Sequence, residues 1–112
     1  MFIDSHAHLD FNEISSNFSK VIKNSNKNKI TSILSICTKI KSFKKLYNLI
    51  KNYKSIWCSI GEHPCNISKN NIPLKNDILS YTLEKKIIAI GETGLDFFHS
   101  TKNIDYQYES LQ

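Results

Sequence analysis

The amino-acid sequence predicts an α/β protein with parallel strands, organised as about half of a (β/α)8 barrel. Short apolar runs rich in β-branched residues alternate with helical stripes along the 112 residues, and this alternation implies a parallel sheet with right-handed crossovers. The strands begin roughly 25 to 32 residues apart, and eight such units need on the order of 250 residues, the usual length of such a barrel. The opposing interpretation is a complete doubly wound sheet, with helices on both faces and one reversal of strand order.

The first half of the chain is expected to contain two strands and two helices. Residues 2–4 open a short strand. Apolar residues recur at helical spacing over Glu13–Lys23, which predicts an amphipathic helix. The segment KITSILSICT (29–38) is apolar and β-branched, as in a strand covered on both faces. A second helical stripe follows, formed by Ile40, Phe43, Tyr47 and Ile50.

The second half repeats the alternation. The segment SIWCSIGEHP (55–64) predicts a third strand, which ends at the glycine and proline it contains. A polar loop leads to a helix around residues 74–84. The fourth strand lies in KIIAIGETGLDFF (86–98), where the apolar run stops at Gly91. A further helix is indicated near the end of the chain by Ile104, Tyr108 and Leu111.

Composition limits the classes of protein that fit. A net charge of +5 comes from lysine alone, because the chain has no arginine. This charge suits a polyanionic partner such as nucleic acid or reflects the codon bias of an A- and T-rich genome, and both interpretations stay open. Cys37 and Cys58 lie in apolar runs, which predicts buried free thiols in a reducing compartment. No signal peptide or long apolar run is present, so we expect a soluble cytoplasmic protein without membrane association.

Chemically active residues follow the predicted strands, where parallel α/β folds place their sites. His6 and His8 are two positions apart in an extended segment, so their imidazoles project from one face. Glu92 follows the apolar run IIAI, and a buried carboxylate there would be costly without a partner. The three residues predict a site for a divalent metal ion, with the carboxylate able to bridge two ions. Ordinary strand-end histidines, and a glutamate paired with a lysine, are the structural alternatives.

Three segments resemble the successive N-terminal motifs of the TatD family of metal-dependent deoxyribonucleases. They are DSHAHLDF (4–11), GEHPCN (61–66) and GETGLDFF (91–98). Their order and spacing also match, and the resemblance covers essentially the whole chain. It implies a TIM-like barrel of the metallo-dependent hydrolase superfamily. It further implies one or two divalent ions, either zinc, manganese or magnesium, and hydrolysis of phosphodiester bonds in DNA by metal-activated water.

Carried over by position, the resemblance makes His6, His8 and Glu92 metal ligands. His63 is a candidate for lining the substrate cleft, although a histidine before proline is more often a loop cap. The family takes two further histidines and a water-activating aspartate from later strands, so no catalytic residue is assigned here. We therefore expect residues 1–112 to be the N-terminal part of a single barrel domain, without a second domain, and to be weakly active or inactive alone.

Some features depart from the family pattern or stay open. Glu62 stands where the family usually has an aliphatic residue, and Cys65 where a histidine is frequent. Asp4 and Asp10 are expected to bond backbone groups or to orient the histidines, and Asp96 is either a turn-stabilising residue or a site residue. An incomplete barrel would leave an apolar edge that favours self-association. The alternative functions are a non-catalytic remnant and a basic module that binds nucleic acid without turnover.

Overall fold

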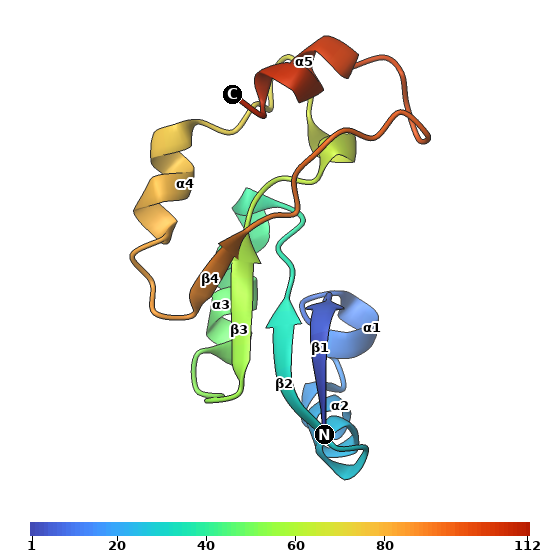
Figure 1. Ribbon diagram of the computed structural model, residues 1–112, viewed down its shortest axis with the longest axis vertical. Coiled ribbons are helices and arrows are strands. Elements are labelled where there is room, and N and C mark those ends of the chain that lie inside the picture. The colour runs from blue at the N-terminus through green and yellow to red at the C-terminus, as the bar shows by residue number, and fades with distance from the viewer.

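The computed structural model describes residues 1–112, and its centre is one parallel sheet. The strands are β1 (Phe2–Ala7), β2 (Ile30–Ser35), β3 (Ile56–Ile60) and β4 (Ile87–Ile90). They pair in the order β1-β2-β3-β4, so each strand lies beside its neighbour in the chain (Figure 1). This order has no reversal, which excludes the doubly wound alternative. The predicted α/β fold with four parallel strands is confirmed.

The connections between the strands contain short helices. These are α1 (Asn12–Ser15), α2 (Phe18–Lys27), η1 (Ile40–Ser42), α3 (Phe43–Ile50), η2 (Pro64–Asn66), α4 (Lys75–Tyr81) and α5 (Ile104–Glu109). The prediction of one continuous helix over Glu13–Lys23 was wrong, because the helix is interrupted after Ser15 and restarts at Phe18. Asn17 precedes α2 with non-helical backbone angles and donates to the Ser16 hydroxyl. Polar side chains of this kind favour helix caps over helix interiors.

The hydrophobic core lies between the sheet and the helices α2 and α3. Helix α2 packs on β2 and helix α3 packs on β3. The core residues are Leu9, Phe18, Ile33, Cys37, Phe43, Leu46, Ile50, Ile56, Cys58 and Ile60. Cys37 and Cys58 are buried free thiols, as predicted, whereas Cys65 is exposed. No helix has the length and apolar character that a membrane crossing requires.

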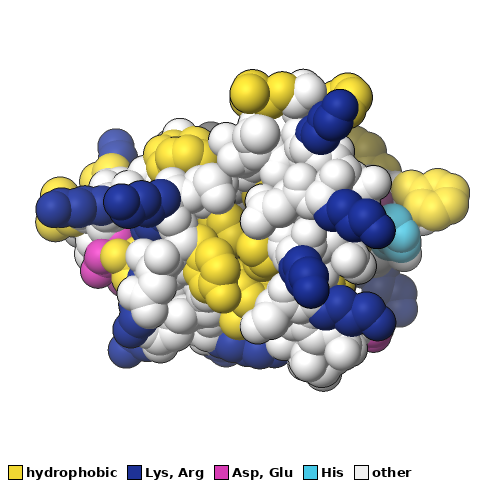
Figure 2. Space-filling view, turned by 90° about the horizontal axis from the view of Figure 1, so that it is seen from below, with side chains coloured by type: hydrophobic (Ala, Val, Ile, Leu, Met, Phe, Trp, Pro, Cys, Tyr) yellow, Lys and Arg dark blue, Asp and Glu magenta, His cyan; other side chains and the backbone are white.

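The two edge strands carry exposed apolar side chains. Phe2 and Ile3 on β1 are exposed, and so are Ile88 and Ile90 on β4. Figure 2 views the molecule from the end at which the strands begin, and there a central group of hydrophobic side chains is flanked by lysines. These lysines lie at the end where the strands begin, whereas the candidate residues lie where the strands end.

Candidate metal centre

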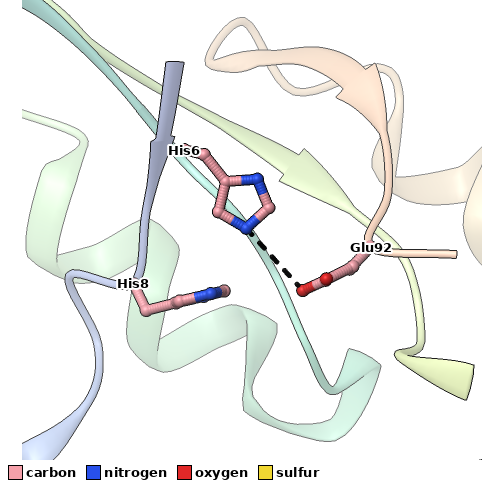
Figure 3. A group of neighbouring side chains, drawn as sticks. All are labelled: His6, His8 and Glu92. Atoms are coloured by element: carbon pink, nitrogen blue, oxygen red, sulfur yellow. Dashed lines mark ion pairs between the residues drawn. The ribbon is translucent and has the colours of Figure 1, made fainter. Parts of the chain in front are cut away.

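The side chains of His6, His8 and Glu92 point toward one another at the carboxyl ends of β1 and β4 (Figure 3). His6 lies within β1 and His8 directly after it, so the extended backbone turns both rings to the same side. One ligand atom from each of the three residues lies within 4.8 Å of the others. The distance from His6 Nε2 to Glu92 Oε2 is 4.0 Å. The three residues that the sequence singled out therefore share one site.

Contacts with its neighbours hold the His8 ring in place. Its Nδ1 lies 3.3 Å from the carbonyl oxygen of Ile36, so Nδ1 carries the proton and donates it, and Nε2 keeps a free lone pair. The ring also stacks on Phe11, with centroids 4.7 Å apart. A histidine whose second nitrogen is bound to a backbone carbonyl is oriented in the way that metal-binding histidines usually are.

The backbone around Glu92 is fixed by hydrogen bonds to the end of β3 and to the segment that follows β2. The Gly91 N–H donates to the Ile60 carbonyl at 2.9 Å, and the Glu92 N–H donates to the Cys37 carbonyl at 2.8 Å. Gly61 lies close to this backbone. A Cβ atom built on it would be 2.5 Å from the Gly91 carbonyl carbon and 2.7 Å from the Glu92 backbone carbonyl oxygen. Glycine at position 61 is therefore required for the close approach that places Glu92.

The Glu92 carboxylate faces histidines rather than lysine. His63 Nε2 lies 3.5 Å from Glu92 Oε1, and His6 is the other ion-pair partner. No lysine in the chain forms an ion pair with Glu92, so the alternative of a structural lysine partner is not observed. The side chain is 27% exposed, which leaves it open to a ligand from solvent.

His63 combines two contacts. Its Nδ1 accepts a hydrogen bond of 3.1 Å from the Cys65 N–H, and it thereby caps η2, as the loop-cap interpretation predicts. An accepting Nδ1 places the proton of the neutral ring on Nε2. His63 therefore presents an N–H toward Glu92 and the space beside it, which suits a hydrogen-bond donor to an anion.

Comparison with known proteins identifies the family of this chain. Residues 3–112 match the family model described as TatD related DNase. The chain belongs to the TatD-related DNase family. The three segments quoted from the sequence, residues 4–11, 61–66 and 91–98, lie within the matched range.

Two curated relatives match almost all of the chain, and a third matches 61% of it. An uncharacterized metal-dependent hydrolase of Buchnera aphidicola subsp. Baizongia pistaciae is 38% identical over 107 residues, which is 90% of this chain and 39% of that protein. The metal-dependent hydrolase YjjV of Escherichia coli is 29% identical over 99% of this chain and 42% of its own length. The 3'-5' ssDNA/RNA exonuclease TatD of Escherichia coli is 28% identical over 61% of this chain. The chain spans about 40% of the length of the curated relatives it matches over nearly its whole extent.

A solved structure shows the same architecture. The crystal structure of YjjV, a TatD homologue from Escherichia coli, superposes on 97% of this chain and 46% of its own, with a TM-score of 0.72 and 25% identity. The four parallel strands therefore match part of a TIM-barrel hydrolase of the TatD family.

Glu62 has a structural role in this TatD-family chain. It is buried, and its carboxylate accepts hydrogen bonds from the Ile40 N–H at 2.9 Å and from the Asn71 side-chain amide at 3.2 Å. Glu62 thus joins the start of η1 to the loop after β3, where the resemblance predicts an aliphatic residue. The sequence carries no local signal for this role, because the partners come from separate loops.

The acidic residues of the first motif differ in their contacts. Asp4 Oδ1 accepts from the His6 N–H at 3.1 Å, so the prediction that it bonds a backbone group is confirmed. Asp10 is buried, and its Oδ1 atom has no hydrogen-bond partner. Lys45 bonds the carbonyl oxygen of Asp10 instead, at 2.8 Å.

Asp96 stabilises the turn after β4. Its Oδ1 accepts from the Phe98 and His99 N–H groups, both at 3.0 Å. The hydrogen bond from the His99 backbone lowers the pKa of Asp96 most. Further hydrogen bonds from the His99 ring and from Cys65 also lower it, so that this pKa lies well below its ordinary value. The turn-stabilising interpretation is confirmed, and the second oxygen of Asp96 remains directed toward Cys65.

Proposed function

We propose that this chain holds a divalent metal ion through His6, His8 and Glu92, as part of a hydrolase that cleaves phosphodiester bonds in DNA. The observation that carries the proposal is the convergence of the two β1 histidines and the carboxylate after β4, with ligand atoms within 4.8 Å of one another. These residues are far apart in the sequence, and only the parallel sheet brings them together.

The donor atoms suit such an ion. Two imidazoles and one carboxylate form a mixed nitrogen and oxygen set, which fits zinc or manganese and, less readily, magnesium. The bond from His8 Nδ1 to the Ile36 carbonyl leaves Nε2 as the ligand nitrogen of the neutral ring, and the backbone bond to Cys37 holds the Glu92 segment. Three protein ligands are the number that catalytic metal sites commonly use, with the remaining positions open to water or substrate. The carboxylate has two oxygens, so one or two ions are compatible with it.

The residues of the site would have different roles in hydrolysis. When bound, a divalent ion lowers the pKa of water and neutralises negative charge that develops on a phosphate. His6 and His8 would bind the ion at the carboxyl end of β1. The Nε2–H of His63 points to the Glu92 side of the site, so it is placed to donate a hydrogen bond to a phosphate oxygen of the substrate.

Family membership supports DNA as the substrate class. The matching family is described as TatD related DNase, and one relative is a single-stranded DNA and RNA exonuclease. The relatives that cover most of the chain are named only as metal-dependent hydrolases. We place residues 1–112 in one structural unit, the N-terminal part of a single barrel domain.

The ligand set is tested by metal titration. Calorimetry with Mn²⁺ on the purified chain should show binding that His6→Ala and Glu92→Gln each weaken by about tenfold or more, since disturbing metal-site residues typically costs 10–100-fold. Glu109→Gln is the matched control, because Glu109 lies on α5 away from the site. Equal affinity in all four proteins would refute the assignment.

The substrate class is tested by binding and cleavage of a short single-stranded DNA. Turnover by the chain alone is expected to be low, so binding is measured beside it. The DNA should bind more tightly with Mn²⁺ than with EDTA, and His63→Ala should weaken binding in Mn²⁺ only. Binding that is equal in EDTA and unchanged in Glu92→Gln would indicate a basic module. Absence of both metal and DNA binding would indicate a non-catalytic remnant.

A further inference from the structure

We infer a second metal site, formed by His63, Cys65 and Asp96, which takes a thiophilic ion of the zinc class. Ligand atoms of these three side chains lie within 4.8 Å of one another. The site shares no ligand with the group formed by His6, His8 and Glu92. Its distinguishing feature is a thiol, the only exposed one of the three in the chain.

Asp96 is held in position by contacts that direct its second carboxylate oxygen toward Cys65 and His99. The buried Gln107 side chain grips its backbone, because Gln107 Oε1 accepts from the Asp96 N–H at 2.7 Å and Gln107 Nε2 donates to the Asp96 carbonyl at 3.1 Å. Oδ1 is occupied by the two N–H groups of the turn. Oδ2 lies 2.7 Å from His99 Nδ1 and 3.2 Å from Cys65 Sγ. A carboxylate fixed in this way loses little freedom when it binds an ion.

Cys65 supplies the soft ligand. It lies in η2, and its Sγ is 3.2 Å from Asp96 Oδ2. A thiolate favours zinc and similar ions over magnesium and manganese. Binding replaces the thiol proton by the metal, and the proton passes to solvent. No redox step is involved.

His63 completes the group through the ring nitrogen on the Cys65 side. Its Nδ1 accepts the capping hydrogen bond of 3.1 Å from the Cys65 N–H, which an ion on Nδ1 would replace, and its Nε2 lies 3.5 Å from Glu92 Oε1. A metal on Nδ1 would leave Nε2–H directed at a carboxylate, which is the usual arrangement of carboxylate, histidine and zinc. The three side chains supply one nitrogen, one sulfur and one oxygen donor. Water would complete the four-coordinate geometry that zinc prefers.

The two sites would be linked through one ion-pair contact. His63 faces Glu92 from the second site, while Glu92 belongs to the first. An ion at the second site therefore fixes the orientation of His63 beside the first. The second site depends only on its own three residues, so its existence does not require the proposed hydrolase activity.

The test uses Co²⁺ as a spectroscopic substitute for Zn²⁺ on the purified chain. Co²⁺ should produce a sulfur-to-cobalt charge-transfer band that Zn²⁺ abolishes by displacement. Cys65→Ser should remove the band, and Asp96→Asn should weaken Co²⁺ binding by about tenfold or more. His6→Ala is the control, and it should keep the band while losing Mn²⁺ affinity at the first site.

Alkylation provides a second measurement on the unaltered chain. Zn²⁺ should protect Cys65 from iodoacetamide, as read by mass spectrometry. Cys37 and Cys58 are buried and should stay unmodified with or without the ion. A charge-transfer band that survives in Cys65→Ser, or equal alkylation of Cys65 with and without Zn²⁺, would overturn the proposal. Neither result would bear on Mn²⁺ binding by His6, His8 and Glu92.

Discussion

Gly61→Ala tests whether the close approach of two backbone segments positions Glu92. The added Cβ would lie 2.5 Å from the Gly91 carbonyl carbon and 2.7 Å from the Glu92 oxygen. Carbon atoms in contact are normally about 3.5–4.0 Å apart, so the segments must separate by roughly 1 Å. The neighbouring atoms are backbone, and no side-chain rotation can relieve the contact.

The expected cost follows from this displacement. Overpacking typically costs about 1–3 kcal/mol, and the reduced freedom of the unfolded chain returns about 0.4–1 kcal/mol when glycine becomes alanine. We expect a net loss of about 1–2 kcal/mol in the free energy of unfolding, as the difference between these effects. The hydrogen bonds from Gly91 to Ile60 and from Glu92 to Cys37 should weaken as well. Mn²⁺ affinity should fall about tenfold, because the carboxylate leaves its place beside the histidines.

The assay combines urea unfolding with Mn²⁺ titration. Gly94→Ala is the matched control, because a Cβ there meets nothing within 4 Å and the cost comes only from the backbone φ of +139°. Gly94→Ala should therefore lower stability while retaining more of the metal affinity than Gly61→Ala. A Gly61→Ala protein with unchanged stability and unchanged Mn²⁺ affinity would show that the close approach does not position Glu92.

Three further predictions concern stability and association. Glu62→Ala removes the partner of the Ile40 N–H and should lower the free energy of unfolding by about 1–3 kcal/mol in urea, with Mn²⁺ affinity unchanged; equal stability would contradict its structural role. Burial raises the pKa of the Cys58 thiol to about 12, so its stabilising effect is complete below the ordinary thiol pKa and is lost as the pH rises toward 12. The free energy of unfolding, measured in urea at increasing alkaline pH, should therefore fall less with pH in Cys58→Ala than in the unaltered chain. Finally, Ile88→Lys should reduce concentration-dependent self-association in analytical ultracentrifugation, because Ile88 is an exposed apolar residue on the edge strand β4.

Much of the fold could be predicted from local patterns. The run IIAI has the continuous apolar, β-branched character of a buried parallel strand, and the helical stripe ending at Ile50 follows the period of 3.6 residues. The exact helix bounds could not be predicted in the same way, because the interruption at Ser16 and Asn17 turns on local polar contacts that compete with the apolar stripe.

His6, His8 and Glu92 could be predicted as a candidate centre from the sequence, since each stands at the end of a predicted strand and parallel strands end at one side of a sheet. Roles that depend on distant partners could be found only in the folded chain. The buried Glu62 accepts a hydrogen bond from Ile40. Gly61 lies against the backbone of Gly91. The Cys65 thiol contacts Asp96 from a separate loop. These roles rest on contacts between segments far apart in the chain, and a distance of a few ångströms between such segments is set by packing rather than by any local sequence pattern.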